Sequence, residues 1–158
     1  MNFWKSLAGK IIYTFLISMV PVVELRGAIP TGYNSGLNIW VAVAVSIIGN
    51  LIPVPFIIIF IRRIFALLRK ISHRFDRLVT RLEKRAENKS EVVKKYSFWG
   101  LFILVAIPLP GTGAWTGALV AAMLDMRLKT ALPAIVAGVV AAGVVVAFIT
   151  CGVDALLF

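Results

Sequence analysis

Glu24 and Arg26 are the residues of this sequence best suited to chemistry in an apolar environment. They flank Leu25 at the edge of uncharged sequence, because residues 11–23 and 27–61 contain no Lys, Arg, Asp or Glu. Charged side chains inside a membrane are costly, and they usually serve an ion or substrate pathway. Arg26 could bind a phosphate or a carboxylate, and Glu24, removed from water, could exchange a proton. The pair therefore predicts an anion site that is linked to proton movement.

Two other interpretations of this pair stay open. Glu24 could instead bind a lipophilic cation between aromatic walls formed by Trp115 and Tyr33. Alternatively, Glu24 and Arg26 could form a structural ion pair that only ties a hairpin to the bundle, since intramembrane charges also pair with each other.

Further polar and helix-breaking residues could complete such a site. Helices that start after Pro30 and after Thr112–Gly113 would direct free backbone N–H groups and the positive end of a helix dipole at the ligand. Asn50, in the middle of a span, would either line the site or hydrogen-bond a neighbouring helix. The candidate substrate-binding residues are Glu24, Arg26, Pro30, Asn50, Pro108, Pro110, Gly111, Thr112, Gly113, Trp115 and Thr116.

The sequence carries no pattern typical of enzymatic, metal or cofactor chemistry. The single histidine, His73, has no Cys or carboxylate at ligand spacing within the membrane region. Ser and Thr residues lack a neighbouring base, and the glycines follow no strand as they do in a phosphate-binding loop. Cys151, the only cysteine, lies in an apolar run and is expected to be a small core residue. We expect no enzyme, no metal and no cofactor.

The composition excludes a soluble globular protein. Hydrophobic residues make up 60% of the 158 residues and charged residues 15%, whereas soluble domains have about 45–50% and about 25%. Lys and Arg total 17 against 7 acidic residues, and residues 62–95 alone hold 12 of these bases and 4 of the acids. Such concentrated charge is typical of a membrane-protein loop, so we expect membrane lipids and no nucleic acid as partners.

The uncharged stretches set the membrane spans. A helix needs about 20 residues to cross a hydrocarbon core about 30 Å thick. Residues 130–153 fit one span, whereas the stretches 27–61 and 96–124 are too long for one straight helix. Each long stretch has a cluster of helix breakers, Arg26–Gly32 with Asn34–Gly36 in the first and Pro108–Gly113 in the second. The pieces on either side of the second cluster are too short to cross alone. We therefore expect re-entrant helical hairpins over 11–36 and 98–124, each followed by a transmembrane helix, over 37–61 and 131–151.

The basic segment 62–95 shows an amphipathic helical pattern. Its apolar residues step by three and four positions, as along one face of a helix: Ile64, Leu68, Ile71, Phe75, Leu78 and Leu82. This seam could pair with a second copy of the chain. A helix that lies on anionic headgroups, or packs on its own bundle, is favoured because the seam covers fewer than three heptads.

Charge also predicts the orientation of the chain. The positive-inside rule places residues 62–95 and the turn 125–129 in the cytoplasm, although Lys5 and Lys10 then lie outside. The two hairpin-plus-helix units thus have opposite orientations, as in transporters with inverted repeats. We therefore predict an all-α integral membrane protein with one membrane domain, residues 1–158, in the cytoplasmic membrane. A long basic amphipathic helix joins the two inverted units.

Two stretches of this chain resemble a known family. Residues 22–30 read VVELRGAIP and residues 105–118 read VAIPLPGTGAWTGA, with Gly49-Asn50 between them. In these motifs and their order the chain resembles the putative small multidrug export proteins of bacteria and archaea. More distantly, its layout is similar to the DedA, or VTT-domain, membrane proteins. That likeness implies paired re-entrant helices and movement of polyprenyl phosphate or phospholipids between leaflets. The further arginine motif of those proteins has no clear counterpart beyond Arg127.

Residues and resemblance together predict a transporter or flippase, proton-linked, for an amphiphilic anion such as a lipid phosphate. The alternatives are an exporter of lipophilic cationic drugs and a membrane scaffold that transports nothing. A homodimer is the expected assembly, because a complete pathway can require more than 158 residues. Small-residue surfaces around Gly138 and Gly143 would let helices approach closely.

Overall fold

The computed structural model describes residues 6–71, 73–109 and 111–157, in part by their backbone alone. All regular elements of these residues are helices, which confirms the predicted all-α fold class. They are α1 (Leu7–Met19), α2 (Glu24–Asn34), α3 (Ile39–Leu51), α4 (Pro53–Ile71), α5 (His73–Tyr96), α6 (Phe98–Ala106), α7 (Ala114–Met123) and α8 (Leu128–Leu157). Within the described residues, two helical segments are long and apolar enough to cross a membrane, Ile39–Ile61 and Leu128–Val153.

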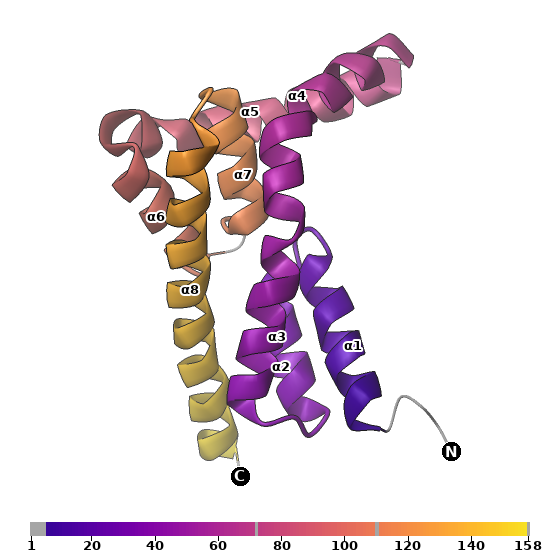
Figure 1. Ribbon diagram of the computed structural model, residues 1–158, viewed down its shortest axis with the longest axis vertical. Coiled ribbons are helices and arrows are strands. Elements are labelled where there is room, and N and C mark those ends of the chain that lie inside the picture. The colour runs from indigo at the N-terminus through magenta and orange to yellow at the C-terminus, as the bar shows by residue number, and fades with distance from the viewer. Residues whose placement is uncertain (1–5, 72, 110, 158) are drawn as a thin grey trace.

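Two helical hairpins approach each other from opposite ends of the bundle (Figure 1). The hairpin α1–α2 opens toward the end where the chain termini lie, which we call the terminal end. The hairpin α6–α7 opens toward the opposite end, crossed by α5, which we call the α5 end. Their connections, residues 20–23 (the first turn) and 107–113 (the second turn), meet near the middle of the bundle.

The helices of the two halves pack in corresponding ways. The first helix of each hairpin packs on the long helix that follows it, α1 on α3 and α6 on α8. The second helix of each hairpin also contacts the long helix of the other half, so that α2 touches α8 and α7 touches α4. Each hairpin therefore packs on long helices from both halves.

The first break in the chain is not where the sequence predicted it. Residues 24–34 form one helix with Pro30 inside it, so the expected irregular segment over Arg26–Gly32 is wrong. The chain breaks instead at Pro21, because the residue before a proline avoids the helical conformation. Val20 accordingly ends α1 with an extended backbone. Within α2, Thr31 donates its hydroxyl to the Gly27 carbonyl (2.7 Å), a bond that helps to satisfy the backbone beside Pro30.

The end of α6 repeats this geometry 87 residues later. Ile107 has an extended backbone before Pro108, as Val20 has before Pro21. A longer irregular stretch follows, with left-handed backbone at Gly111 (φ 78°) and at Gly113 (φ 140°).

The connections into the long helices are also alike. After α2 the Leu37 N–H donates to the Gly32 carbonyl (3.1 Å), and after α7 the Met126 N–H donates to the Ala121 carbonyl (2.9 Å). The residues before these donors, Gly36 and Asp125, both have a positive φ, as in a Schellman helix end. The two connections correspond at a spacing of 89 residues.

Glycines extend this correspondence into the helix contacts. A Cβ added at Gly49 of α3 would lie 2.7 Å from the Phe15 carbonyl oxygen of α1, and one at Gly138 of α8 would lie 3.0 Å from that of Phe102 in α6. Both helix pairs can pack at these distances because no side chain intervenes. The spacings of 87 and 89 residues differ from the 78 that separates the two Ala-Ile-Pro tripeptides in the sequence.

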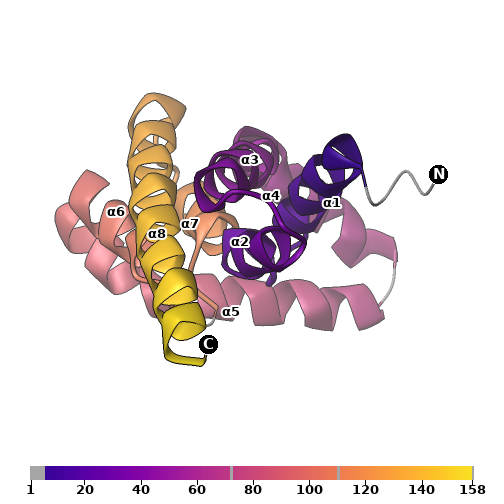
Figure 2. The same cartoon turned by 90° about the horizontal axis from the view of Figure 1, so that it is seen from below.

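The basic segment is not the single helix predicted over 62–95. α4 continues from the membrane span to Ile71 and α5 starts at His73, so the chain folds back on itself. The two helices lie side by side in an arm that projects from the bundle, and α5 then runs crosswise toward α6 (Figures 1 and 2). The predicted seam is thus divided: Ile64 and Leu78 are exposed, and Leu68, Ile71 and Phe75 lie outside the described side chains.

α5 packs on its own bundle through a different stripe. Val79, Ala86 and Val93 are spaced by seven residues and are at most 2% exposed. The helix contacts α4, α6 and α7, and it leaves Arg77, Arg81 and other basic side chains exposed. The turn after Ile71 has a physical reason, because a straight continuation of α4 would carry this apolar stripe away from the bundle into water.

Candidate functional site

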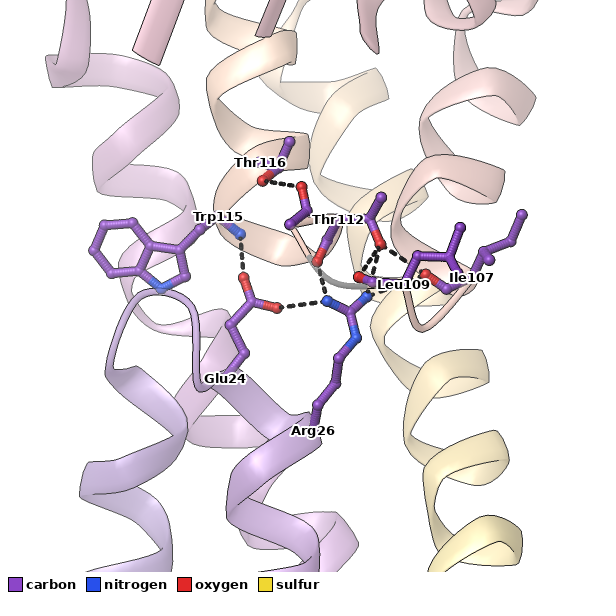
Figure 3. Close-up of polar contacts among 8 residues, drawn as sticks. Glu24, Arg26, Ile107, Leu109, Thr112, Trp115 and Thr116 are labelled. Atoms are coloured by element: carbon purple, nitrogen blue, oxygen red, sulfur yellow. Dashed lines mark hydrogen bonds and ion pairs between the residues drawn. The ribbon is translucent and has the colours of Figure 1, made fainter. Parts of the chain in front are cut away.

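The carboxylate of Glu24 lies at the N-terminus of α7. Glu24 is 3% exposed, and its Oε1 accepts a hydrogen bond from the backbone N–H of Trp115 (3.1 Å; Figure 3). The first N–H groups of a helix have no partner within the helix, and the dipole there favours negative charge. Gly113, which precedes α7, has no side chain to cap it, so Glu24 of the other hairpin supplies the cap.

Arg26 binds the irregular backbone of the second turn. Its guanidinium donates to the carbonyl oxygens of Thr112 and Ile107 (the latter at 3.1 Å) and to the Thr112 hydroxyl (3.1 Å). It also forms an ion pair with Glu24, with 3.8 Å between Nη1 and Oε2. Irregular backbone lacks the hydrogen bonds that a helix provides, so its carbonyl groups need other partners. Arg26 provides these partners from the first hairpin (Figure 3).

Two threonines complete the network. The Thr112 hydroxyl lies within donor distance of the Ile107 and Leu109 carbonyl oxygens (both 2.8 Å), and the Thr116 hydroxyl donates to the Gly111 carbonyl (3.1 Å). The second turn is therefore held by side chains from α2 and α7 together.

A cavity of about 590 Å³ adjoins Glu24 on the side of α5. Its walls come from the first turn, α4, α5, the second turn and α7, and they are mainly apolar. The lining residues are Pro21, Val22, Glu24, Ile57, Ile61, Phe65, Leu82, Ala86, Gly111, Thr112, Trp115, Thr116 and Leu119. Glu24 is the one ionisable residue among them, and Arg26 is absent from this set. A cavity of this kind suits an apolar or amphiphilic molecule that places its polar group at Glu24.

The structure brings most of the predicted site residues together. Glu24, Arg26, Gly111, Thr112, Gly113, Trp115 and Thr116 all lie where the two turns meet, with Pro108 in the second turn. Pro30 lies inside α2, so no helix begins after it and the expected helix N-terminus there is wrong. Pro110 lies outside the described residues.

Two other residues considered for the site, Tyr33 and Asn50, do not line the cavity. Tyr33 lies at the far end of α2, about 14 Å along the helix from Glu24, and is not an aromatic wall of this cavity. Asn50 is fully buried in α3, and neither its amide oxygen nor its nitrogen has a partner among the described residues. Ser46, one helical turn earlier, is equally buried and its hydroxyl likewise has no partner there.

Sequence reasoning missed the apolar walls of the cavity. Pro21 and Val22 were read as part of a helix, and Phe65, Leu82 and Ala86 were assigned to a basic helix outside the membrane. Pro21 carried a usable signal, because a proline preceded by an uncharged helical stretch marks a helix end. The described residues contain no group of three His, Cys, Asp or Glu that could hold a metal ion.

These features define a class of protein: a helical membrane protein whose buried polar site lies between two opposed hairpins. The chain matches the family model of the putative small multi-drug export proteins over residues 24–145, more than half of its length, and it belongs to that family. No curated protein and no solved structure matches the chain. The matched region contains the second turn, the Glu24–Arg26 pair and all the helices from α2 to α7.

Proposed function

We propose that this protein is a membrane transporter or flippase for an amphiphilic anion, such as a lipid phosphate, and that proton exchange at Glu24 drives its cycle. One observation carries the proposal: the carboxylate of Glu24 occupies the N-terminus of α7 beside Arg26, facing the cavity. The Glu24 carboxylate therefore lies where the hydrogen-bond donors for an anionic headgroup converge.

The proposed architecture is two inverted units, each a re-entrant hairpin followed by a membrane span. The opposed directions of the hairpins and the corresponding contacts 87 to 89 residues apart support this architecture. The positive-inside rule assigns the α5 end to the cytoplasm, because α5 and the turn with Arg127 and Lys129 share that end. The first hairpin would then enter the membrane from the opposite side.

Proton exchange follows from the contacts of Glu24. While ionised, Glu24 accepts the Trp115 N–H and faces Arg26, so both positive features of the site are already neutralised. When Glu24 takes up a proton, its attraction to the helix N-terminus and to Arg26 weakens. A phosphate or carboxylate can then accept hydrogen bonds from the Trp115 N–H and from Arg26, while its apolar tail occupies the cavity.

Export of lipophilic cations is a second candidate, and a specific observation favours it. Glu24 is the one ionisable residue among the cavity-lining residues, and the Trp115 ring stands beside it. A cation could bind there against the carboxylate and the aromatic face. The description of the family as small multi-drug export proteins points in the same direction. A scaffold that transports nothing would require neither the cavity nor a carboxylate facing it.

The test is transport by the purified protein in liposomes. We would measure two activities side by side: the transbilayer movement of a fluorescent anionic phospholipid and the uptake of ethidium, both across a pH gradient. The anion mechanism predicts movement of the phospholipid, its loss in Arg26→Ala, and movement without pH dependence in Glu24→Gln. The cation mechanism predicts ethidium uptake that Glu24→Gln abolishes. The control is Glu87→Gln, an exposed change on α5 that should alter neither activity. Absence of both activities would contradict the proposed transport function.

A further inference from the structure

The correspondence between the two halves assigns the cavity beside Glu24 an equivalent place between α2, α8 and the second turn. A spacing of 89 residues relates α7 to α2 and the end of the first span to the end of α8, and a spacing of 87 relates the two turns. The cavity walls at Trp115, Thr116 and Leu119 therefore correspond to Arg26, Gly27 and Pro30. Likewise, Ile57 and Ile61 correspond to Val146 and Thr150, and Pro21 corresponds to Pro108.

The two corresponding places differ in the polar contacts that hold them. At the second turn, Arg26 of α2 donates to the Ile107 and Thr112 carbonyls. At the first turn, the corresponding residue is Trp115 of α7. Its indole Nε1 is buried and has no partner among the described residues, and the residue lines the cavity.

A buried indole N–H without an acceptor is costly, which indicates that its partner is engaged in another arrangement. In Figure 3 the indole nitrogen of Trp115 is directed at the first turn. That turn supplies backbone carbonyls, as the second turn does for Arg26. Trp115 and the first turn thus have the components of the contact that Arg26 makes with the second turn.

We propose that the protein has a second state with a second substrate cavity, between α2, α8 and the second turn. In that state Trp115 donates its indole N–H to a carbonyl of residues 20–23 and closes the present cavity. Arg26 releases the second turn, and a cavity lined by Arg26, Gly27, Pro30, Pro108, Val146 and Thr150 opens toward the terminal end. The inference rests on the proposed transport function, because an amphiphile that enters by one cavity would leave by the other.

Glu24 is placed to serve both cavities. It belongs to α2 but caps α7, and it lies where the two turns meet. The second cavity differs from the first in having Arg26 on its wall, so it suits the anionic headgroup of the same amphiphile. Because Arg26 makes several charge-assisted bonds and Trp115 offers one neutral donor, the state seen here is the more populated one.

The experiment measures the accessibility of two single cysteines in a Cys151→Ser background. One replaces Ile57 in the present cavity and the other replaces Val146 in the proposed one. Each is labelled in liposomes with a membrane-impermeant thiol reagent, and a cysteine at Val139 of α8, which is fully buried and lies outside both cavities, is the matched control. Two backgrounds should favour the second state independently: Arg26→Gln weakens the present contact, and Trp115→Arg strengthens the opposite one.

In both backgrounds we expect labelling at residue 146 to accelerate about tenfold and labelling at residue 57 to slow, since the minor state of such an equilibrium is about 0.1–10% populated. Residue 139 should not change. If residue 146 stays unreactive in both backgrounds, or if residues 57, 139 and 146 all become more reactive together, the inference is wrong. These measurements need no substrate. A reciprocal change without phospholipid movement would contradict the transport function alone, and movement without a reciprocal change would contradict the second cavity alone.

Discussion

Gly113 lies directly against the carboxylate of Glu24, so the two hairpins meet at a position that has no side chain. A Cβ at residue 113 would overlap the Oε2 atom of Glu24. The backbone there has φ 140°, which side chains other than hydrogen disfavour. Both the carboxylate position and the backbone conformation therefore depend on glycine at 113.

Gly113→Ala should destabilise the protein by roughly 1–3 kcal/mol, the range for a residue held in a sparsely populated backbone region, and should displace Glu24 from α7. The measurement is thermal unfolding in detergent. Gly152→Ala is the control: its Cβ would meet nothing within 4 Å, so it should leave stability unchanged or raise it slightly. Equal melting temperatures for the two variants would contradict the contact between Gly113 and Glu24.

Glu24 and Arg26 should contribute to stability mostly through separate partners. Glu24→Gln keeps an oxygen that can accept the Trp115 N–H, so a loss of about 1 kcal/mol or less is expected. Arg26→Ala removes the guanidinium bonds to the Thr112 and Ile107 carbonyls and should cost about 1.5–3 kcal/mol, the range for hydrogen bonds of charged groups. A double-mutant cycle should give a coupling of about 1 kcal/mol or less, because the ion pair is long at 3.8 Å. A double mutant clearly more stable than Arg26→Ala would show instead that the pair is mainly structural.

The orientation of the chain can be tested by labelling from one side of the cell membrane. Cysteines that replace Arg81 and Lys84, both exposed on α5, should react only with reagents that reach the cytoplasm. A cysteine that replaces the exposed Asn38, in the connection at the terminal end, should react from outside. Labelling of residue 81 by an impermeant reagent added to intact cells would overturn the proposed orientation.

Two neighbouring residues of α5 distinguish packing on the bundle from pairing with a second copy. Val79 is fully buried and Leu78 is 49% exposed. Val79→Ser should lower the free energy of unfolding by about 2 kcal/mol through the loss of buried apolar surface, without a change in mass by light scattering. Leu78→Ser should leave stability nearly unchanged. If Leu78→Ser reduces the mass of the detergent-solubilised protein, the exposed side of α5 joins two copies.

Much of the helical layout could be predicted from the sequence, because uncharged stretches have lengths that a bilayer dictates. The second break was also visible, since Pro108 and the glycines after it cannot all be accommodated in one helix. The first break was misplaced because both Pro21 and Pro30 are candidates by local chemistry. Tertiary contacts distinguish them: a helix that begins at Glu24 places that carboxylate on α7 and Arg26 on the second turn.

The fold-back after Ile71 depends on contacts that no local pattern carries. The seam through Leu78 and the stripe through Val79 are both regular in spacing, and only the surfaces of α4, α6 and α7 select the second. The cavity could not be predicted for the same reason. Its walls combine residues 21, 65, 86 and 119, which are far apart in the sequence and show no local pattern that marks a cavity.

The cap on α7 also has a consequence for how the protein is made. Glu24 and the N–H group that it binds are 91 residues apart, so the ribosome synthesises the carboxylate long before the helix that requires it. During translation Glu24 therefore lacks its hydrogen-bond donor on α7 until the second hairpin is made, and the N-terminus of α7 depends on a cap from the first hairpin. Neither half is a finished folding unit, and a nascent chain truncated before residue 112 should be recognised by membrane quality-control proteases.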